Sequence, residues 1–416
     1  MAKKADAARR DHAPTHFPTT AQSNVRAFKG VRLKRGVVIV GGGIAGSALA
    51  IALARGGITT TLVEREAHWA PASSGIFIYS NGLQALDRLG VLDDICESGW
   101  VSPDGGNLYL TAGGETITRT VYPKFGDHIP AIVGIRRLEL HRVLAARLER
   151  LGVIVRLGVT VASISDEDFA KPVTVALSDG SILTCDLLVG ADGIRSQVRT
   201  HLFGPIEPFY TGLGVWRSTH AKPATIDTKI MMMGVGTRLG IMPISRDELY
   251  MFGTTSEPDK PFYPRETWPQ QMRRKFSAFK GPAEPLLDEI AQADQVFYTA
   301  IEEMHLPLPW SKGRVVLVGD AAHSSSPFMG QGGAMALEDG LVLAEMLASA
   351  DDIPSACAAF SERRFERCKF VQEESRRVGQ AGAVENLEAT VIRNERMRSS
   401  AQRDVDAFYA RIAEPI

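Results

Sequence analysis

The earliest regular pattern of hydrophobic positions along the chain is a strand–turn–helix–strand unit. Residues 37–40 form a short β-branched run, which is typical of a buried parallel strand. Three glycines interrupt this run, small helix-forming residues follow at 47–55, and residues 59–63 repeat the strand pattern before Glu64. The spacing predicts a βαβ crossover between two parallel strands.

The middle of the chain changes from this pattern to a different one. A helix at 141–151 and a strand at 153–157 are predicted first, and apolar runs at 185–189 and 314–318 predict strands that end on glycine-containing turns. Apolar and polar positions alternate in residues 206–300, where the first long helix is predicted at 268–279. This region therefore predicts an antiparallel sheet inserted into an α/β domain.

Beyond residue 347 the chain becomes charged and helical, with helices predicted at 360–380 and 393–412. The pattern as a whole divides the chain into four parts. These are a flexible basic tail at 1–35, an α/β domain at 36–205 and 300–350, an inserted β-sheet domain at 206–299, and C-terminal helices at 351–416.

The composition is that of an ordinary globular protein, with 44% hydrophobic and 23% charged residues in a chain of 416. A net charge of −1 gives no field that would attract nucleic acid, so we expect no nucleic-acid partner. The four cysteines lie far apart and form no CxxC pair. They are typical of reduced thiols in a cytoplasmic protein, and they argue against a disulfide scaffold or a bound metal.

The longest apolar stretch, residues 37–54, is long enough to raise the question of a membrane span. Its central Gly41-Gly42-Gly43 favours a turn instead, so we expect no integral membrane segment. Residues 1–35 are basic and poor in acids but lack the apolar core of a secretory signal. We interpret them as a solvated flexible tail, with an organellar transit peptide or an anion-binding arm as alternatives.

The first chemical motif is Gly41-x-Gly43-x-x-Gly46, placed between the first strand and its helix. The glycines permit a tight turn, a close approach of backbone to a pyrophosphate, and helix–strand packing. The free N–H groups at the helix N-terminus then face the phosphates. Glu64 follows at the end of the next strand, where its carboxylate could accept the ribose hydroxyls of an adenosine. The unit predicts a dinucleotide site.

Two further motifs join a buried strand to a polar, glycine-containing turn. Gly319-Asp320 follows the strand at 314–318 and leads through a glycine-rich segment, residues 327–334, into a helix predicted at 334–347. An aspartate there could hold a polyol hydroxyl, and the helix N-terminus could stabilise negative charge on a ring. The third motif, Asp192-Gly193, follows the strand at 185–189. Either turn taken alone is an ordinary strand end.

In this order and spacing, the three motifs resemble those of the single-component (class A) flavoprotein aromatic hydroxylases, which have the fold of para-hydroxybenzoate hydroxylase. The resemblance covers residues 36–350. It implies a Rossmann-type FAD-binding domain at 36–205 and 300–350, an inserted antiparallel sheet at 206–299 that binds substrate, and a C-terminal helical segment. We expect a monomer or a homodimer.

The resemblance also implies which residues hold non-covalent FAD. Residues 43–45 would meet the pyrophosphate, Glu64 the ribose, and Asp320 the ribityl chain, while the backbone at 332–334 would face the pyrimidine side of the flavin. Asp192-Gly193 matches a second fingerprint linked to FAD and to the nicotinamide nucleotide. The full set is Gly41, Gly43, Ile44, Ala45, Gly46, Glu64, Arg65, Arg137, Val161, Asp192, Gly193, Asp320, Gly330, Gly332, Gly333 and Ala334. Family members often carry an arginine in the stretch matching residues 69–76; this chain does not, and Arg65 is the candidate replacement.

The chemistry implied by the family is the hydroxylation of a small aromatic or N-heteroaromatic substrate. NADH or NADPH reduces FAD, O₂ adds to give a flavin C4a-hydroperoxide, and its distal oxygen is transferred to the ring. A flavin-dependent epoxidase or isoprenoid reductase of the same fold, or a non-catalytic FAD-bound scaffold, are the alternatives.

Substrate contacts are expected from the inserted sheet and the loop at 327–328. Arg217 lies in an apolar strand, where it could pair with a substrate carboxylate or phenolate. A role as a surface arginine or in a structural ion pair is equally supported by the sequence. Met231–Met233 of the strand at 229–233 must point to alternating faces, which favours core filling. The catalytic group is not assigned; Arg217, His305 and Tyr250 are candidates, and a proton-transfer role is also considered for His323. The substrate candidates are Tyr210, Trp216, Arg217, Met242, Tyr250, Pro327 and Phe328.

Overall fold

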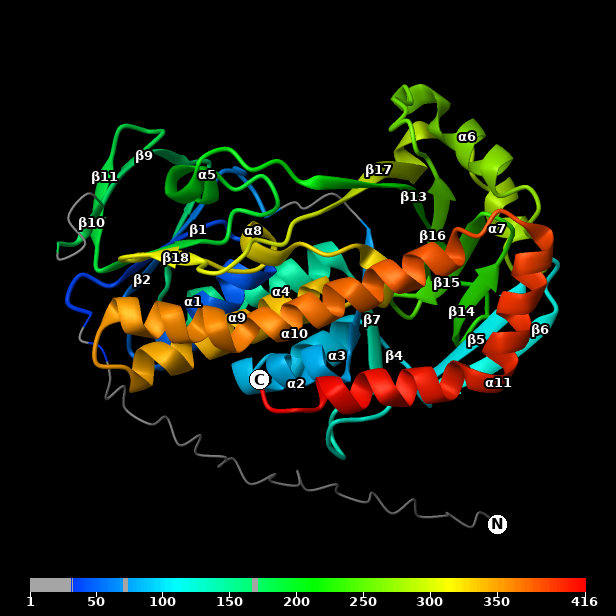
Figure 1. The fold of residues 1–416 in the computed structure, drawn as a ribbon, viewed down its shortest axis with the longest axis horizontal. Helices are drawn as coiled ribbons and strands as arrows, with labels where there is room; N and C mark the ends of the chain where they lie inside the picture. The colour runs from blue at the N-terminus through cyan, green and yellow to red at the C-terminus, as the bar shows by residue number, and fades with distance from the viewer. Residues whose placement is uncertain (1–30, 32, 70–73, 167–170) are drawn as a thin grey trace, which may run out of the picture.

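The computed structural model describes residues 31, 33–69, 74–166 and 171–416 (Figure 1). The tail predicted at 1–35 lies almost wholly outside the described residues. Val31, which falls inside that tail, is 8% exposed, and its N–H donates to the Leu347 carbonyl at 3.1 Å. The ordered domain therefore begins a few residues earlier than the pattern predicted.

A six-stranded sheet forms the centre of the α/β domain, in the order β18-β19-β12-β1-β2-β8. All pairs are parallel except β18–β19, which is antiparallel. Helix α1 lies against β1 and β2 and contacts both α4 and α9. The elements are β1 (Val37–Val40), α1 (Ile44–Arg55), β2 (Thr60–Glu64), α4 (Arg137–Arg150), β8 (Ile154–Leu157), β12 (Leu187–Gly190), α5 (Gln197–Phe203), β18 (Ser311–Lys312), β19 (Val315–Leu317), α8 (Asp320–His323), η3 (Pro327–Met329) and α9 (Gly332–Ser349).

Two small sheets complete this part of the molecule. One has the order β11-β10-β9, and the other, β3-β7-β4, lies where the α/β domain meets the large sheet. Their elements, with the two helices that follow β3, are β3 (Gly75–Tyr79), α2 (Ser80–Leu89), α3 (Leu92–Ser98), β4 (Trp100–Val101), β7 (Ile132–Arg136), β9 (Val161–Ser165), β10 (Val173–Leu177) and β11 (Ile182–Cys185).

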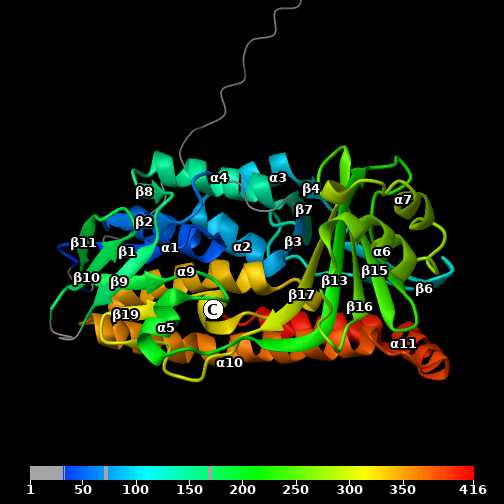
Figure 2. The same ribbon diagram turned by 90° about the horizontal axis from the view of Figure 1, so that it is seen from above.

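The large sheet has seven strands, in the order β17-β13-β16-β15-β14-β5-β6 (Figure 2). All its pairs are antiparallel except β14–β5. Its elements and the helices on its outer face are β5 (Gly106–Thr111), β6 (Thr116–Val121), β13 (Phe209–Ala221), β14 (Lys229–Met233), β15 (Thr237–Pro243), β16 (Glu248–Ser256), η1 (Arg265–Thr267), α6 (Trp268–Lys275), α7 (Glu284–Asp288), η2 (Ala293–Gln295) and β17 (Val296–Glu303).

This sheet corrects the boundaries predicted for the inserted domain. Strands β5 and β6 come from residues 106–121, outside the predicted 206–299, and the β14–β5 pair is parallel within a sheet predicted to be antiparallel. Strand β17 also crosses the predicted boundary at residue 299. Alternation of apolar and polar residues identifies a half-buried strand, but it does not reveal which distant strand will pair with it.

The two faces of the large sheet pack against different cores. The outer face, with Trp216, Met232 and Met251, forms a core with α6 and α7, whereas Met231 and Tyr250 face the α/β domain. Consecutive methionines on β14 thus point to opposite faces, as a strand requires.

Two long helices connect the ends of the molecule. Helix α10 (Ile353–Gly382) packs against α9 and extends toward the large sheet, and α11 (Leu387–Ile412) returns to pack on β6 (Figure 1). Both begin earlier than predicted because Asp352 and Asn386 cap their N-termini by accepting hydrogen bonds from backbone N–H groups. Among the described helices, none combines the length and apolar character that crossing a bilayer demands.

Candidate active site

The first glycine motif forms the turn that the sequence predicted. A Cβ on Gly41, whose φ is +106°, would lie 2.3 Å from the Ala191 carbonyl oxygen, and one on Gly46 would lie 2.0 Å from that of Gly41. Side chains are therefore excluded at both positions. Gly43 has open space around its Cβ position, and as the N-cap of α1 it leaves the first N–H groups of the helix without a side-chain cap. This open helix N-terminus is suited to a pyrophosphate.

Glu64 lies at the end of β2, beside this turn. Its carboxylate accepts hydrogen bonds from the backbone N–H of Gly42 at 2.7 Å and of Glu66 at 2.9 Å. These contacts fix the carboxylate beside the turn, and its contact with the ribose stays a prediction. Arg65 is exposed and pairs with Glu66. Val161, at the start of β9, is near the same edge, because the N–H of Val159 donates to the Glu64 carbonyl.

The fold brings the second motif against the first. A Cβ on Gly319, whose φ is +61°, would lie 2.8 Å from the Cβ of Ala45, so the Gly319-Asp320 turn rests on α1. At the start of α9, a Cβ on Gly333 would lie 3.6 Å from the side chain of Ile44. The N-termini of α1 and α9 thus converge, and α9 also leaves its first N–H groups without a side-chain cap.

Asp320, the first residue of α8, lies next to these helix ends, and Arg137 lies near it. Solvent reaches both side chains, yet protein surrounds them closely enough that burial lowers the pKa of Arg137 and raises that of Asp320. Each charge also acts on the pKa of the other. Arg137 is the first residue of α4, and its N–H donates to the Ser74 carbonyl at 2.9 Å. We call this place the recess; it could hold a polyol chain between an acid and a base.

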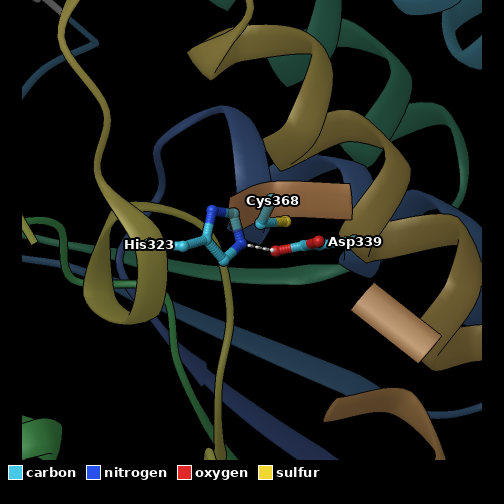
Figure 3. Close-up of side chains that lie close together, drawn as sticks. All are labelled: His323, Asp339 and Cys368. Atoms are coloured by element: carbon cyan, nitrogen blue, oxygen red, sulfur yellow. Dashed lines mark hydrogen bonds and ion pairs between the residues drawn. The ribbon is translucent and has the colours of Figure 1, made fainter. Parts of the chain in front are cut away.

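A buried ion pair supports the Asp320 turn from below (Figure 3). Asp339 Oδ2 lies 2.6 Å from Nε2 of His323 and accepts the Gly319 N–H at 2.7 Å, while Oδ1 accepts from Arg364 at 2.8 Å. Burial opposes the charge on His323, but Cys368 and Asp339 outweigh it and hold the pKa of the imidazole well above its usual value. The possible metal-binding atoms of His323, Asp339 and Cys368 lie within 4.8 Å of one another. The carboxylate of Asp339, however, is already engaged by three hydrogen-bond donors. His323 is therefore a structural residue.

Comparison with known proteins identifies the group that this geometry fits. Residues 34–352 match the family described as the FAD binding domain. The chain is 33% identical to the aurachin C monooxygenase/isomerase of Stigmatella aurantiaca, over 89% of this chain and 96% of that protein. It is also 33% identical to the 2-heptyl-3-hydroxy-4(1H)-quinolone synthase of Pseudomonas aeruginosa, over 87% and 93%. The Klebsiella pneumoniae HpxO structure with FAD and uric acid matches with a TM-score of 0.80 at 25% identity, over 91% of this chain and 97% of that one.

The chain belongs to the class A FAD-dependent aromatic hydroxylases. It is an FAD-dependent monooxygenase, and the resemblance found in its sequence is confirmed. The structure fits FAD by its own features: glycines where a side chain would collide, two uncapped helix N-termini, and a recess between Arg137 and Asp320.

Asp192 and Gly193 form the third motif, and here the structure shows a local role for the carboxylate. Asp192 accepts hydrogen bonds from Ser196 Oγ, the Gln197 N–H and the Val198 N–H, which organise the start of α5. Gly193, with φ +79° and open space around it, leaves the backbone accessible. A contact between Asp192 and FAD remains a prediction.

Arg217 and Tyr250 line one hollow of about 330 Å³, together with Ser74, Arg136, Glu248 and Phe297. Arg217 is half-buried, and its Nη1 donates to Thr299 Oγ1 at 2.6 Å. Ser74 lines this hollow and its carbonyl accepts the N–H of Arg137, so the Arg217 hollow adjoins the recess. Met242 is buried as the Cα partner of Tyr250 on the neighbouring strand.

The structure does not bring the other predicted substrate residues to this hollow. Trp216 is fully buried on the outer face of the sheet, 4.5 Å from the Tyr298 ring centroid, so it belongs to the core and its prediction as a substrate contact was wrong. Its neighbour Arg217 points the other way because side chains alternate along a strand. The Tyr210 hydroxyl donates to the Glu257 carbonyl, and burial raises its pKa to about 12. His305 packs on Phe365, with 4.9 Å between the ring centroids, and charged residues of α10 act on its pKa.

Phe328 lines a second hollow, of about 440 Å³, with Phe209, Leu213, Glu303 and Arg376 among its other walls. We call it the Phe328 hollow. Pro327 precedes this ring and is exposed, while Gly330 comes so close to Tyr79 that a Cβ would lie 2.8 Å from its ring. The sequence included residues 229–233 in the sheet expected to contact substrate, but it gave Lys229 no separate role and did not single out Arg238. A charged residue inside an apolar strand was the signal that could have drawn attention to both side chains.

Proposed function

We propose that this monooxygenase hydroxylates a small aromatic or N-heteroaromatic ring that carries a polar oxygen, using NADH or NADPH and O₂. The proposal rests on the Arg217 hollow. This hollow is lined by a guanidinium and by aromatic side chains, and it lies next to the recess. Relatives that are 33%, 30% and 26% identical to this chain are named for a 4(1H)-quinolone, urate and 6-hydroxynicotinate, respectively. A 4-quinolone is the first candidate substrate.

Different residues of the chain would bind different parts of FAD and of the substrate. The N–H groups of residues 43–45 would meet the pyrophosphate, Glu64 the ribose, Asp320 the ribityl chain, and the N-terminus of α9 the pyrimidine side of the flavin. FAD, when bound, supplies electron transfer and oxygen activation, with one oxygen atom of O₂ entering the ring and the other leaving as water. Thr299 holds Arg217, whose remaining N–H groups would orient an anionic substrate oxygen.

Tyr250 and Met242 would form the apolar wall that keeps water from the reacting ring. We propose that the enzyme acts in the cytoplasm as a monomer or homodimer. The four free cysteines, three of them buried, support a reducing compartment.

The decisive experiment is a screen for substrates that stimulate NAD(P)H oxidation by the FAD-loaded protein. Quinolones, hydroxypyridines and phenolic acids are the first compounds to test. Under ¹⁸O₂, a hydroxylase incorporates one labelled atom into the product, whereas an isoprenoid reductase incorporates none. Stimulation without a hydroxylated or labelled product would contradict the proposal.

A further inference from the structure

The Phe328 hollow lies between the start of β13 and the segment that leads into α9. Its volume is about 440 Å³, against about 330 Å³ for the Arg217 hollow. Phe328 belongs to η3, and α9 begins at Gly332, shortly after η3 ends. One wall of the hollow is therefore continuous with the helix N-terminus that would face the flavin.

Strand β13 is irregular where it borders this hollow. Between Tyr210 and Gly214 its pairing with β17 shifts register, because four steps along β13 face only two steps along β17. Gly212, inside this segment, has a φ of +78° and open space around its Cβ position. A bulge bends a strand and changes the direction of its side chains. Here the side chains that the bulge directs toward the hollow are Thr211 and Leu213.

The polar groups that line the hollow are already paired within the protein. Nη2 of Arg376 donates to the buried carboxylate of Glu303 at 2.6 Å, and the Ser326 N–H donates to the same carboxylate at 3.3 Å. Thr211 Oγ1 donates to a backbone carbonyl of β17 at 2.9 Å, and Ser326 Oγ to a serine of α10 at 3.1 Å. An ionic ligand would have to compete with the ion pair between Arg376 and Glu303, which is costly when one partner is buried.

The hollow does offer apolar surface. Phe209, Leu213 and Phe328 line it, and Phe209 is 65% exposed. The ring of Phe328 is held in place, because the guanidinium carbon of Arg238 lies 4.3 Å from its centroid and a Cβ on Gly379 would lie 2.3 Å from it. Fixed apolar walls whose polar neighbours are already paired favour an apolar group of a ligand.

The two hollows border the same face of β13. Trp216 packs in the outer core, and β13 pairs regularly with β16 from Leu213 onward, so Leu213 and Arg217 both point toward the α/β domain. Four residues of a strand span about 13 Å. A small ring whose oxygen contacts Arg217 would therefore not fill the Phe328 hollow by itself, whereas a chain attached to that ring would reach it.

We propose that the Phe328 hollow binds an alkyl chain carried by the aromatic substrate, while the polar oxygen of the ring contacts Arg217. This inference rests on the proposed hydroxylase function. The chain is held by burial of its apolar surface against Phe209, Leu213 and Phe328. Each CH₂ group that is buried should raise the affinity about threefold to fourfold, so the hollow selects ring compounds with a chain over those without one.

The test uses the FAD-loaded enzyme and a series of 4(1H)-quinolones that carry straight chains of one, three, five and seven carbons at position 2. The change in flavin absorbance on binding gives Kd, and stimulated NAD(P)H oxidation gives KM and kcat. We expect the Kd of the wild type to fall about threefold to fourfold for each added CH₂ group until the hollow is filled. The value of kcat should change much less, because the chain is remote from the reacting carbon.

Two variants change the walls of the hollow. Phe209→Ser combined with Leu213→Gln makes the β13 wall polar, and the gain in affinity per CH₂ group should fall to about twofold or less. Leu213→Trp occupies part of the space, so the affinity should stop rising at a shorter chain. Phe262→Ser is the control, since Phe262 is 88% exposed and lines neither hollow; it should keep the chain-length dependence of the wild type. FAD content and melting temperature report on folding in each variant.

The inference would be overturned by wild-type Kd values that do not depend on chain length, or by the same dependence in the wild type and in both wall variants. A dependence that is lost in Phe297→Ser instead would place the chain in the Arg217 hollow and would overturn it as well. Failure of the hydroxylase function gives a different pattern. In that case Kd depends on chain length through Leu213, yet no ring compound in the screen stimulates NAD(P)H oxidation.

Discussion

His323 and Asp339 form an ion pair that is shielded from water, with Nε2 of the histidine 2.6 Å from Oδ2 of the aspartate. The pair joins the end of the Gly319-Asp320 turn to the middle of α9. Because the same aspartate accepts the Gly319 N–H, the position of Asp320 depends on a buried histidine.

This pair predicts a specific dependence of stability on pH. The pKa of His323 is raised in the folded state, so folded protein keeps a proton that the unfolded chain releases above its usual pKa of about 6.5. The contribution of His323 to stability should therefore fall as pH rises beyond that value, by up to about 1.4 kcal/mol per pH unit. Urea unfolding between pH 6 and 8.5 should show it as a difference between the stabilities of wild type and His323→Gln that changes with this slope. His128→Gln, at an exposed histidine, is the control; identical slopes in wild type and His323→Gln would contradict the assignment.

Glu64→Ala should weaken FAD binding. The carboxylate is held in place by the N–H groups of Gly42 and Glu66, and its loss removes a charged hydrogen-bonding group worth ~1.5–3 kcal/mol. Fluorescence titration of the apoprotein with FAD measures the effect. Glu66→Ala, two residues away, should leave the affinity within about threefold of wild type. A Glu64 variant that binds FAD normally would remove this residue from the site.

Asp320→Ala should separate cofactor binding from folding. Burial raises the pKa of this carboxyl, so the folded state disfavours its charge and removing it should not lower the stability of the apoprotein. FAD affinity or turnover should fall nonetheless. Differential scanning fluorimetry of the apoprotein and FAD titration give the two readouts. Normal flavin content together with normal turnover would show that the ribityl chain is held elsewhere.

Arg217→Ala tests the substrate side of the recess. If the guanidinium orients an anionic oxygen, the substrate KM should rise and reduced flavin should lose its oxygen as H₂O₂ instead of transferring it. A desolvated charge pair is worth ~2–5 kcal/mol, whereas a rim arginine is worth less than about 1. NAD(P)H consumed, product formed and peroxide released are measured together. Arg217→Lys keeps the charge but loses the planar fork, so it should be intermediate. Wild-type KM and coupling in both variants would make Arg217 a structural residue.

The features that the sequence predicted well are those with strict steric requirements. Gly41 and Gly46 lie where a side chain would collide with backbone, and Gly319 lies where it would collide with Ala45. The position of these glycines after predicted strands therefore marked the turns correctly. Trp216 shows the opposite case. Strand alternation says that Trp216 and Arg217 face opposite ways, but only the packing of α6 decides which face is core.

The pairing of distant strands was beyond the reach of the sequence for a related reason. β5 joins β14 through backbone hydrogen bonds, which carry no residue code, so neither this pair nor the gathering of Tyr79, Tyr122 and Lys229 could be predicted locally. The contacts of Asp339 could not be predicted either, because its partners lie on two segments, residues 319–323 and Arg364, that are distant from it in the sequence.

Helix α10 makes two contacts with distant parts of the enzyme, and the angle between them around the helix axis is fixed. Arg364 points to Asp339 beneath the Asp320 turn, and fifteen residues later Gly379 receives the Phe328 ring, which would be 2.3 Å from a Cβ there. Inserting a single residue between these two positions would turn one contact by about 100° relative to the other and shift it by about 1.5 Å. Exposed side chains of this segment can therefore change without affecting either contact. A change in the length of the segment would displace either Arg364 from Asp339 or Gly379 from the Phe328 ring.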